Sequence, residues 1–245
     1  MIDWRRFVPR ALRRSERLRR ELERRSGGRV LGGPFAGLRD LWRSFGSELA
    51  PKLLGTYEME IREPLESAIA RLPEVVLVAG AAEGYYAVGL ALRLPGARIV
   101  AFEARADGRE ELARLATANG VSSRIEIAGL CDIPSFGRAL GAGRGRFVLC
   151  DVDGAESLLL DPGVVPALLS AEILVETHDA FVAGTEELLQ AKFSSSHRIE
   201  AFRQRPRALD DAPSLDLPRR YEGALLQAMN ERRPEANHWL HLLPR

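Results

Sequence analysis

From residue 73 onward, short apolar segments alternate with segments of helical spacing, and this alternation limits the possible folds more than any other feature. Continuous apolar runs such as Val75–Ala79 predict strands that are buried on both faces, which is typical of parallel sheets covered by helices. The expected strands are Val75–Ala79, Arg98–Phe102, Ser123–Leu130, Phe147–Val152, Ile173–Thr177, His197–Phe202 and His238–Leu243. The expected helices are 81–94, 108–119, 164–169, 184–193 and 221–230. The pattern predicts an α/β fold with a doubly wound, mainly parallel sheet.

The first 72 residues lack this alternation and differ in charge from the rest of the chain. Residues 1–25 contain ten arginines against four acidic residues, a local net charge of +6, so the remainder carries −5 of the total of +1. We expect residues 1–72 to form a basic helical extension and linker, and residues 73–245 to form the main domain. The arginine-rich helix is either a solvated surface or a contact for an anionic lipid, a polyanion or an acidic partner. Four carboxylates of this extension are expected on a solvated helix face: Glu58, Glu60, Glu63 and Glu66.

Composition excludes several classes of protein. Cys131 and Cys150 are too few for a disulfide framework or a four-thiolate zinc site, which favours a reduced, cytoplasmic setting. The apolar stretches fall well short of the roughly 20 residues needed to span a bilayer, so no integral membrane segment is expected. The acidic balance of the main domain, and the lack of an Asn-Pro-Pro-aromatic run after the fourth strand, argue against nucleic acid as a partner.

The turn after the first expected strand is the first candidate for ligand binding, because doubly wound sheets bind ligands beyond the carboxyl ends of their strands. Gly80, Ala82 and Gly84 are small enough for a ligand to approach the backbone there. Tyr85 occupies the sixth position, where a dinucleotide-binding turn needs a small residue. The spacing therefore favours a nucleoside ligand without a pyrophosphate over NAD, and a tight turn without any ligand is the alternative.

Two acidic residues follow the next two strands. Glu103 ends the second strand, 19 residues beyond Gly84, where a carboxylate can accept hydrogen bonds from both hydroxyls of a ribose. The alternative for Glu103 is a solvated loop acid beside Arg105. Asp132 follows the third strand, where it either accepts from the exocyclic amine of an adenine or forms an Asx-type turn before Pro134.

More carboxylates gather after the fourth and fifth strands. The run Asp-Val-Asp-Gly-Ala-Glu at 151–156 can hold the amino group of a cofactor, a divalent cation or a substrate hydroxyl. If these two strands are neighbours, Asp151 and Asp153 share one opening with His178, which can then act as general base for a hydroxyl. The alternative is a loop histidine bonded to Asp179. No spacing rule supports a metal ligand set, so none is predicted.

These residues resemble the motifs of class I S-adenosylmethionine-dependent methyltransferases. The strand at 75–79 followed by Gly-Ala-Ala-Glu-Gly-Tyr-Tyr at 80–86 resembles their motif I. The run at 151–156 resembles the Asp-x-Glu-Gly-Ala-Glu signature of the FkbM-like branch, and Leu-Val-Glu-Thr-His at 174–178 resembles its following strand. The resemblance covers residues 73–205.

The resemblance implies a seven-stranded Rossmann-like sheet with an antiparallel last strand, S-adenosylmethionine as cofactor, and methyl transfer to an oxygen of a sugar, glycolipid or small metabolite. The cofactor-binding positions that it implies are Gly80, Ala82, Gly84, Glu103, Asp132 and Asp151. The candidates for orientation and proton removal are Asp151, Asp153 and His178. Val78 stands where the family has an acidic residue, which leaves open weaker cofactor binding, compensation by Glu83 or Asp151, or a chain without activity. The alternative function is a non-catalytic Rossmann-like protein that docks through its basic N-terminal helix.

Overall fold

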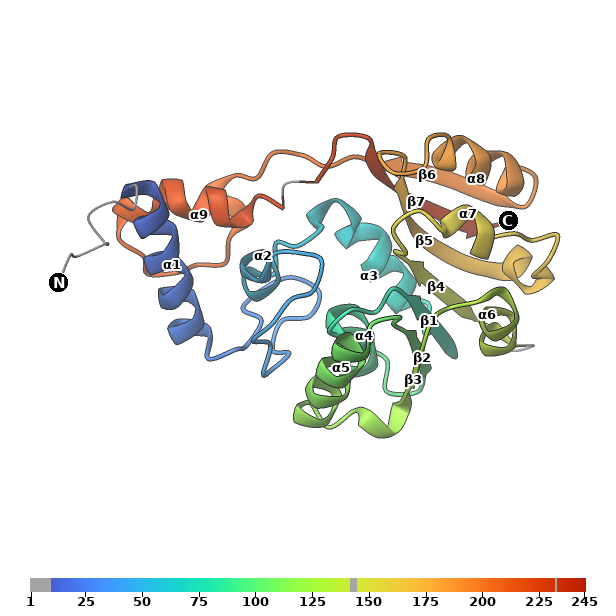
Figure 1. Cartoon of the computed structure of the whole chain (residues 1–245), viewed down its shortest axis with the longest axis horizontal. Coiled ribbons are helices and arrows are strands. Elements are labelled where there is room, and N and C mark those ends of the chain that lie inside the picture. Colours follow the sequence, from blue (N-terminus) through green and yellow to red (C-terminus); the bar gives the residue numbers. More distant parts are fainter. Residues whose placement is uncertain (1–9, 142–144, 232) are drawn as a thin grey trace.

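The computed structural model describes residues 10–141, 145–231 and 233–245, which fold around one sheet (Figure 1). The sheet has seven strands in the order β3-β2-β1-β4-β5-β7-β6, and β7 runs antiparallel to both of its neighbours. The strands are β1 (Val75–Ala79), β2 (Arg98–Phe102), β3 (Ile125–Ala128), β4 (Arg146–Cys150), β5 (Ala171–His178), β6 (His197–Phe202) and β7 (Asn237–Pro244). The predicted fold class and all seven predicted strands are confirmed.

Helices cover both faces of the sheet, which explains why its central strands are apolar throughout. In β1, Val76 and Val78 pack into one core with helices α3 to α5, while Leu77 and Ala79 pack into a second core with α6 and α8. The helices of these layers are α3 (Arg62–Ala70), α4 (Tyr85–Arg93), α5 (Ala106–Ala118), α6 (Ile133–Leu140), α7 (Glu156–Leu159) and α8 (Thr185–Phe193). Short 3-10 turns lie at η2 (Met59–Ile61), η3 (Ser122–Arg124), η4 (Pro166–Ser170), η5 (Leu209–Asp211) and η6 (Arg219–Tyr221).

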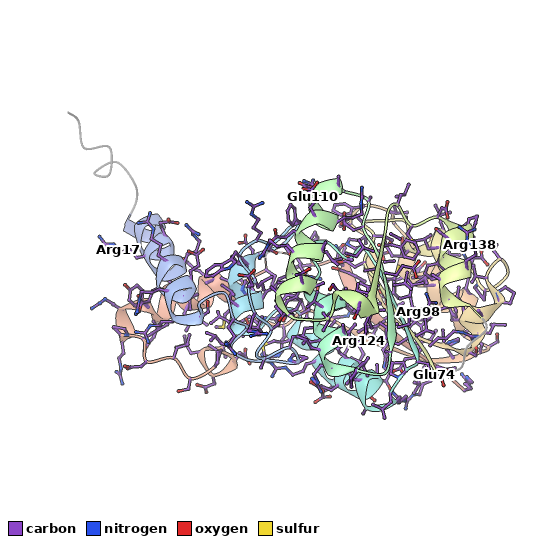
Figure 2. All side chains as sticks on the ribbon, turned by 90° about the horizontal axis from the view of Figure 1, so that it is seen from below. Arg17, Glu74, Arg98, Glu110, Arg124 and Arg138 are labelled. Atoms are coloured by element: carbon purple, nitrogen blue, oxygen red, sulfur yellow. The ribbon has the colours of Figure 1, made fainter. Side chains whose placement is uncertain are left out.

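Three further helices form a separate lobe beside the sheet: α1 (Arg10–Ser26), α2 (Leu49–Leu54) and α9 (Glu222–Met229). Leu18 and Leu22 of α1 are each 1% exposed because they pack against α2 and α9. The apolar stripe of the basic helix therefore faces the protein. Arg17 of this helix and Arg138 of α6 lie at opposite ends of the molecule (Figure 2). Residues 1–9 of the predicted leader lie outside the described residues. No helix in the described part of the chain combines the length and the apolar character needed to cross a bilayer.

Several strands and helices begin or end a few residues from the predicted positions, and three helical segments differ more strongly. The helix predicted to begin at Ala81 begins at Tyr85, because Gly80, Ala82 and Gly84 adopt positive φ angles of 82°, 47° and 97° that no helix accommodates. Helix α6 was not predicted, because its sequence contains the breakers Pro134 and Gly137. The predicted helix 164–169 is instead the 3-10 turn η4.

Candidate functional site

A cavity of about 290 Å³ opens at the carboxyl ends of β1 and β4, where the strand order reverses. This is the place where doubly wound sheets bind their ligands, and the volume is close to the lower end of the range for small-molecule sites, about 300–1,000 Å³. The residues that line it are Phe45, Gly46, Ser47, Lys52, Tyr57, Gly80, Ala81, Ala82, Glu83, Tyr85, Tyr86, Glu103, Arg105, Asp151 and Asp153.

The turn after β1 forms the floor of this cavity. The amides of Gly80 and Ala81 donate to the carbonyl oxygen of Phe102, which ties the turn to the end of β2. A Cβ at Gly80 would lie 1.6 Å from the carbonyl oxygen of Asp151, so only glycine allows the ends of β1 and β4 to approach this closely. The small residue at position 80 thus brings Asp151 to the cavity.

Glu103 also lines the cavity, at the end of β2. Its Oε2 accepts from the amide of Ala82 at 2.7 Å, and its Oε1 accepts from the amide of Arg105 at 2.8 Å. The side chain is buried, and Gly108 lies so close that a Cβ there would be 2.9 Å from the Cγ of Glu103. An ionised carboxylate offers about four acceptor sites. Two of them therefore remain for a ligand after both backbone contacts are made.

Two predicted cofactor residues do not line the cavity. Gly84 has φ +97° and lies under Leu112, whose Cγ would be 2.8 Å from a Cβ at that position, so Gly84 shapes the turn from behind. The Asp132 side chain is exposed and accepts from the amide of Ser135 at 2.7 Å as the N-cap of α6. Asp132 therefore caps helix α6 and lies outside the cavity lining.

Sequence reasoning missed the residues that the N-terminal region contributes. Lys52 of α2 is 3% exposed and forms an ion pair with Glu83, which is completely buried beneath the turn. The Lys52 ammonium lies 4.8 Å from the ring centroid of Tyr57 and 5.5 Å from that of Tyr85. The second carboxylate oxygen of Glu83 accepts from the amide of Phe45 at 2.9 Å. One buried carboxylate thus fixes the segment at 45–57 against motif I.

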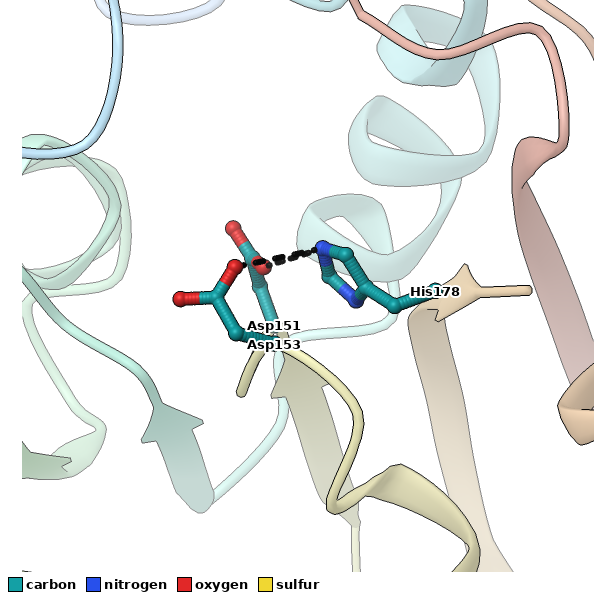
Figure 3. A group of neighbouring side chains, drawn as sticks. All are labelled: Asp151, Asp153 and His178. Carbon is teal, nitrogen blue, oxygen red and sulfur yellow. Dashed lines mark ion pairs between the residues drawn. The ribbon is translucent and has the colours of Figure 1, made fainter. Parts of the chain in front are cut away.

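The structure brings Asp151, Asp153 and His178 together from the ends of β4 and β5 (Figure 3). Nδ1 of His178 donates to Glu156 at 2.7 Å, which leaves Nε2 as the unprotonated nitrogen of the neutral ring. This Nε2 lies 3.6 Å from Asp151 Oδ1 and 3.5 Å from Asp153 Oδ1. Phe181 stacks on the imidazole with ring centroids 5.6 Å apart and planes at 4°. The histidine is therefore fixed on three sides with Nε2 directed at the two aspartates.

Burial and mutual repulsion shift the pKa values of this cluster. Burial, with the charges of Asp153 and Glu156 also opposing ionisation, raises the pKa of Asp151 to about 6 despite the favourable charge of His178. Burial and the charges of Asp151 and Asp153 raise the pKa of Glu176, and the ion pair with Arg233 opposes that shift. Burial alone would lower the pKa of His178, but the Glu156 hydrogen bond and the neighbouring carboxylates outweigh it and raise that pKa. The cluster consequently takes up protons near neutral pH, as a site for acid–base chemistry requires.

The raised pKa of Asp151 predicts that Asp151→Asn stabilises the protein at alkaline pH. A carboxyl with a pKa raised from 3.8 to about 6 by folding contributes stability below its unfolded pKa and loses it as the pH rises through the folded pKa. Above pH 6 the parent protein holds a charge on a side chain that is only 27% exposed, and asparagine carries no such charge. We expect the free energy of unfolding of the variant to exceed that of the parent protein by about 1–3 kcal/mol at pH 8, and the two values to be nearly equal at pH 4.

Urea unfolding across this pH range measures the effect, with Asp210→Asn, at an exposed surface position, as the matched control. Two results would contradict the expectation that the ionised Asp151 carboxylate destabilises the folded protein. One is a variant less stable than the parent protein at pH 8, and the other is a difference in unfolding free energy that does not change with pH.

The same side chains offer donors for a metal ion. Asp151, Asp153 and His178 each present one ligand atom, all within 4.8 Å of one another, and Glu58, Asp151 and Glu176 form a second such group. Carboxylate oxygen and imidazole nitrogen suit divalent cations in type. Asp179 does not join them, because its carboxylate accepts from the amides of Gly184 and Glu186 at the start of α8.

The prediction of a solvated glutamate face was wrong for Glu58 and Glu60. Glu58 is 1% exposed, has a positive φ of 48°, and accepts hydrogen bonds from the Tyr86 hydroxyl and from Arg233. The Glu60 side chain is 5% exposed and lies 2.9 Å from Nη2 of Arg207. Both arginines come from the connection between β6 and β7, 175 residues beyond Glu58 and 147 residues beyond Glu60. The local sequence pattern carries no signal for such pairs, so only the tertiary structure reveals them.

No protein-family model and no curated protein matches the sequence, but solved structures share its fold. A Klebsiella pneumoniae protein provisionally named an O-methyltransferase is 12% identical and aligns over 97% of this chain and 91% of its own, with a TM-score of 0.53. The O-methyltransferase TomG of Streptomyces achromogenes, involved in tomaymycin synthesis and solved with SAM, is 15% identical over 73% of this chain and 76% of its own (TM-score 0.50). An O-methyltransferase of Bacillus cereus in complex with SAH is 12% identical over 73% and 77% (TM-score 0.50). The chain therefore has the Rossmann-like fold of these methyltransferases.

Proposed function

We propose that the protein is an S-adenosylmethionine-dependent methyltransferase of the FkbM-like branch that methylates an oxygen of a sugar, glycolipid or small metabolite. The observation that carries the proposal is the cavity at the reversal of strand order, with the carboxylate of Glu103 at its edge and free acceptor sites on that carboxylate. Solved proteins of the same fold hold SAM or SAH, which supports an adenosyl ligand here. We propose residues 73–245 as the main domain and residues 1–72 as an extension, whose helix α3 packs into the core of the sheet and whose helix α1 packs against α9.

The lining residues match the parts of this cofactor in chemical type. Gly80 and Ala82 permit close approach to the backbone, and Glu103 offers acceptors for the ribose hydroxyls. We assign Asp151, which lines the cavity, to the amino group of the methionine end, where it would take over from the acidic residue that Val78 replaces. Gly84 holds the turn in shape, and Asp132 caps helix α6 outside the cavity lining. The adenosyl sulfonium supplies an activated methyl group when bound.

The protein residues then have three tasks: to orient the acceptor hydroxyl, to exclude water and to accept its proton. Nε2 of His178 is the acceptor for that proton, because Glu156 fixes the tautomer that leaves its lone pair free. Asp151 and Asp153 stabilise the imidazolium that forms, since both lie within 3.6 Å of Nε2. A raised pKa of His178 means that the base becomes available as the pH rises through that value.

Calorimetric titration with SAM, SAH and NADH tests the proposed function. We expect both adenosyl ligands to bind one site and NADH to give no heat, because Tyr85 opens helix α4 where a pyrophosphate would need a small residue. Absence of heat with both adenosyl ligands would instead support a non-catalytic protein on this scaffold.

Glu103→Gln should weaken SAH binding by about tenfold to a hundredfold, because hydrogen bonds to a charged acceptor are worth about 1.5–3 kcal/mol. The amide group of glutamine would also oppose one of the two backbone donors that Glu103 now satisfies. Calorimetry on the parent and variant proteins measures the change. Glu126→Gln, at a 64% exposed side chain on β3, is the matched control and should leave affinity unchanged. Equal affinity of Glu103→Gln and the parent would exclude the ribose role.

A further inference from the structure

A second cavity, of about 730 Å³, lies in the connection between β6 and β7. Its walls come from the outgoing leg at 203–207, the returning leg at 233–238 and the C-terminal half of α9. Because β6 ends and antiparallel β7 begins at the carboxyl edge of the parallel strands, this connection emerges on the same side of the sheet as the candidate active site. The cavity is thus placed where an acceptor can enter.

The lining of this cavity is strongly basic. It includes four arginines and His238, against the single carboxylate of Glu235. The arginines are Arg203, Arg205, Arg207 and Arg233. Three of these arginines pair with carboxylates that are not lining residues: Arg205 with Asp211, Arg207 with Glu60 and Glu231, and Arg233 with Glu58, Glu176 and Glu231. The charges of these three guanidinium groups are therefore compensated.

Arg203 differs from the other three, because it has no carboxylate partner in the described part of the chain. Its Nη1 donates to Nε2 of His238 at 2.8 Å, and Nδ1 of that histidine donates to Glu186 at 2.7 Å. A ring that accepts at Nε2 and donates at Nδ1 is neutral, so it positions the guanidinium without compensating its charge. In addition, Nε of Arg207 is buried without an acceptor among the described residues. The cavity wall therefore presents, at Arg203, a positive charge that no carboxylate of the described residues compensates.

The cavity adjoins the candidate base through two side chains. Nη1 of Arg233 lies 2.6 Å from Oε1 of Glu176, and Oε2 of Glu176 lies 3.8 Å from Nε2 of His178. Arg233 also donates to the hydroxyl of Tyr57, which lines the cofactor cavity. An anion held at the arginines thus sits next to both the cofactor cavity and the base.

We propose that the methyl acceptor is a phosphorylated hydroxyl compound, such as a sugar phosphate, whose phosphate binds in this cavity at Arg203. The proposal rests on the proposed methyltransferase function. A phosphate has more charge and more acceptor oxygens than a carboxylate, so the uncompensated guanidinium group of Arg203 should bind a phosphate more tightly than a carboxylate.

Calorimetry of the full chain at low salt, with and without SAH, tests this with glucose 6-phosphate, glucose and glucuronate as probes. We expect glucose 6-phosphate to bind, glucose not to bind, and glucuronate to bind more weakly. Arg203→Gln should weaken glucose 6-phosphate binding by about tenfold or more, since a hydrogen bond to a charged group is lost. Arg203→Lys keeps the positive charge but loses the two parallel N–H donors of the guanidinium group, so its affinity for glucose 6-phosphate should lie between those of the parent protein and Arg203→Gln.

The matched control is Arg198→Gln, at a 64% exposed arginine of β6 that pairs with Glu200 outside this cavity, and it should bind like the parent protein. Failure of glucose 6-phosphate to bind, equal binding by Arg203→Gln, or glucuronate binding as tight as that of the phosphate would each overturn the assignment. A protein that binds SAH but no phosphate refutes this inference alone. One that binds phosphate but neither SAM nor SAH refutes the methyltransferase function.

Discussion

Lys52→Met is expected to lower the free energy of unfolding by about 3–5 kcal/mol, because it leaves the carboxylate of Glu83 buried without its partner. Glu83 is completely buried and Lys52 is 3% exposed, so water cannot replace the lost ammonium. The remaining hydrogen bond, from the amide of Phe45, does not neutralise the charge. For a domain of this size the melting temperature should fall by about 10 °C, which urea and thermal unfolding will both register.

The double variant Lys52→Met, Glu83→Gln separates a lost charge pair from a lost packing contact. Glutamine can still accept from the amide of Phe45 and carries no charge, so most of the stability should return. SAH affinity should fall in the single variant, because Glu83 holds the turn that forms the cavity floor. If the free energy of unfolding of Lys52→Met stays within about 1 kcal/mol of that of the parent protein, the ion pair of Lys52 and Glu83 does not stabilise the fold as expected.

The sheet was predictable from the sequence because its signals are local. Each central strand is buried by helices on both faces, so runs such as Val75–Ala79 are apolar throughout and need no knowledge of the rest of the chain. The turn at 80–84 was likewise visible, since small residues follow the strand directly. The predicted start of the next helix was wrong, because the positive φ of Ala82 is set by contacts of the turn and not by a propensity of alanine.

The candidate site was predictable only where its residues directly follow strands. His178 and Asp151 could be placed near one another because parallel strands end at one edge of the sheet. The pair of Glu58 and Arg233 could not, because 175 residues separate its members and each side chain looks like an ordinary surface charge in its own segment. Hydrophobic periodicity reports burial of apolar side chains, and it says nothing of a carboxylate that is buried because a distant arginine compensates it.

His178→Asn should reduce kcat for methyl transfer by about a hundredfold to ten-thousandfold, the usual range for a general base, while SAM affinity stays near that of the parent protein. Nε2 of His178 is the one ring nitrogen free to take a proton, since Nδ1 is committed to Glu156. The carboxylates around the ring raise the pKa of His178, so kcat of the parent should rise with pH through a value above the 6.5 of an ordinary histidine. The variant should lack this rise. SAH formation, measured with an acceptor that the parent protein turns over, gives both profiles.

His241→Asn is the matched control, because His241 is also a buried histidine that pairs with a carboxylate, Glu172, at 2.7 Å. It lies on β7, opposite Leu174 of β5 and away from the carboxyl edge. Its loss should lower stability by an amount similar to that of His178 without changing the pH dependence of kcat. A His178→Asn variant that keeps the pH profile of the parent would show that another group accepts the proton. Asp151, whose pKa lies near 6, would then be the next base to replace.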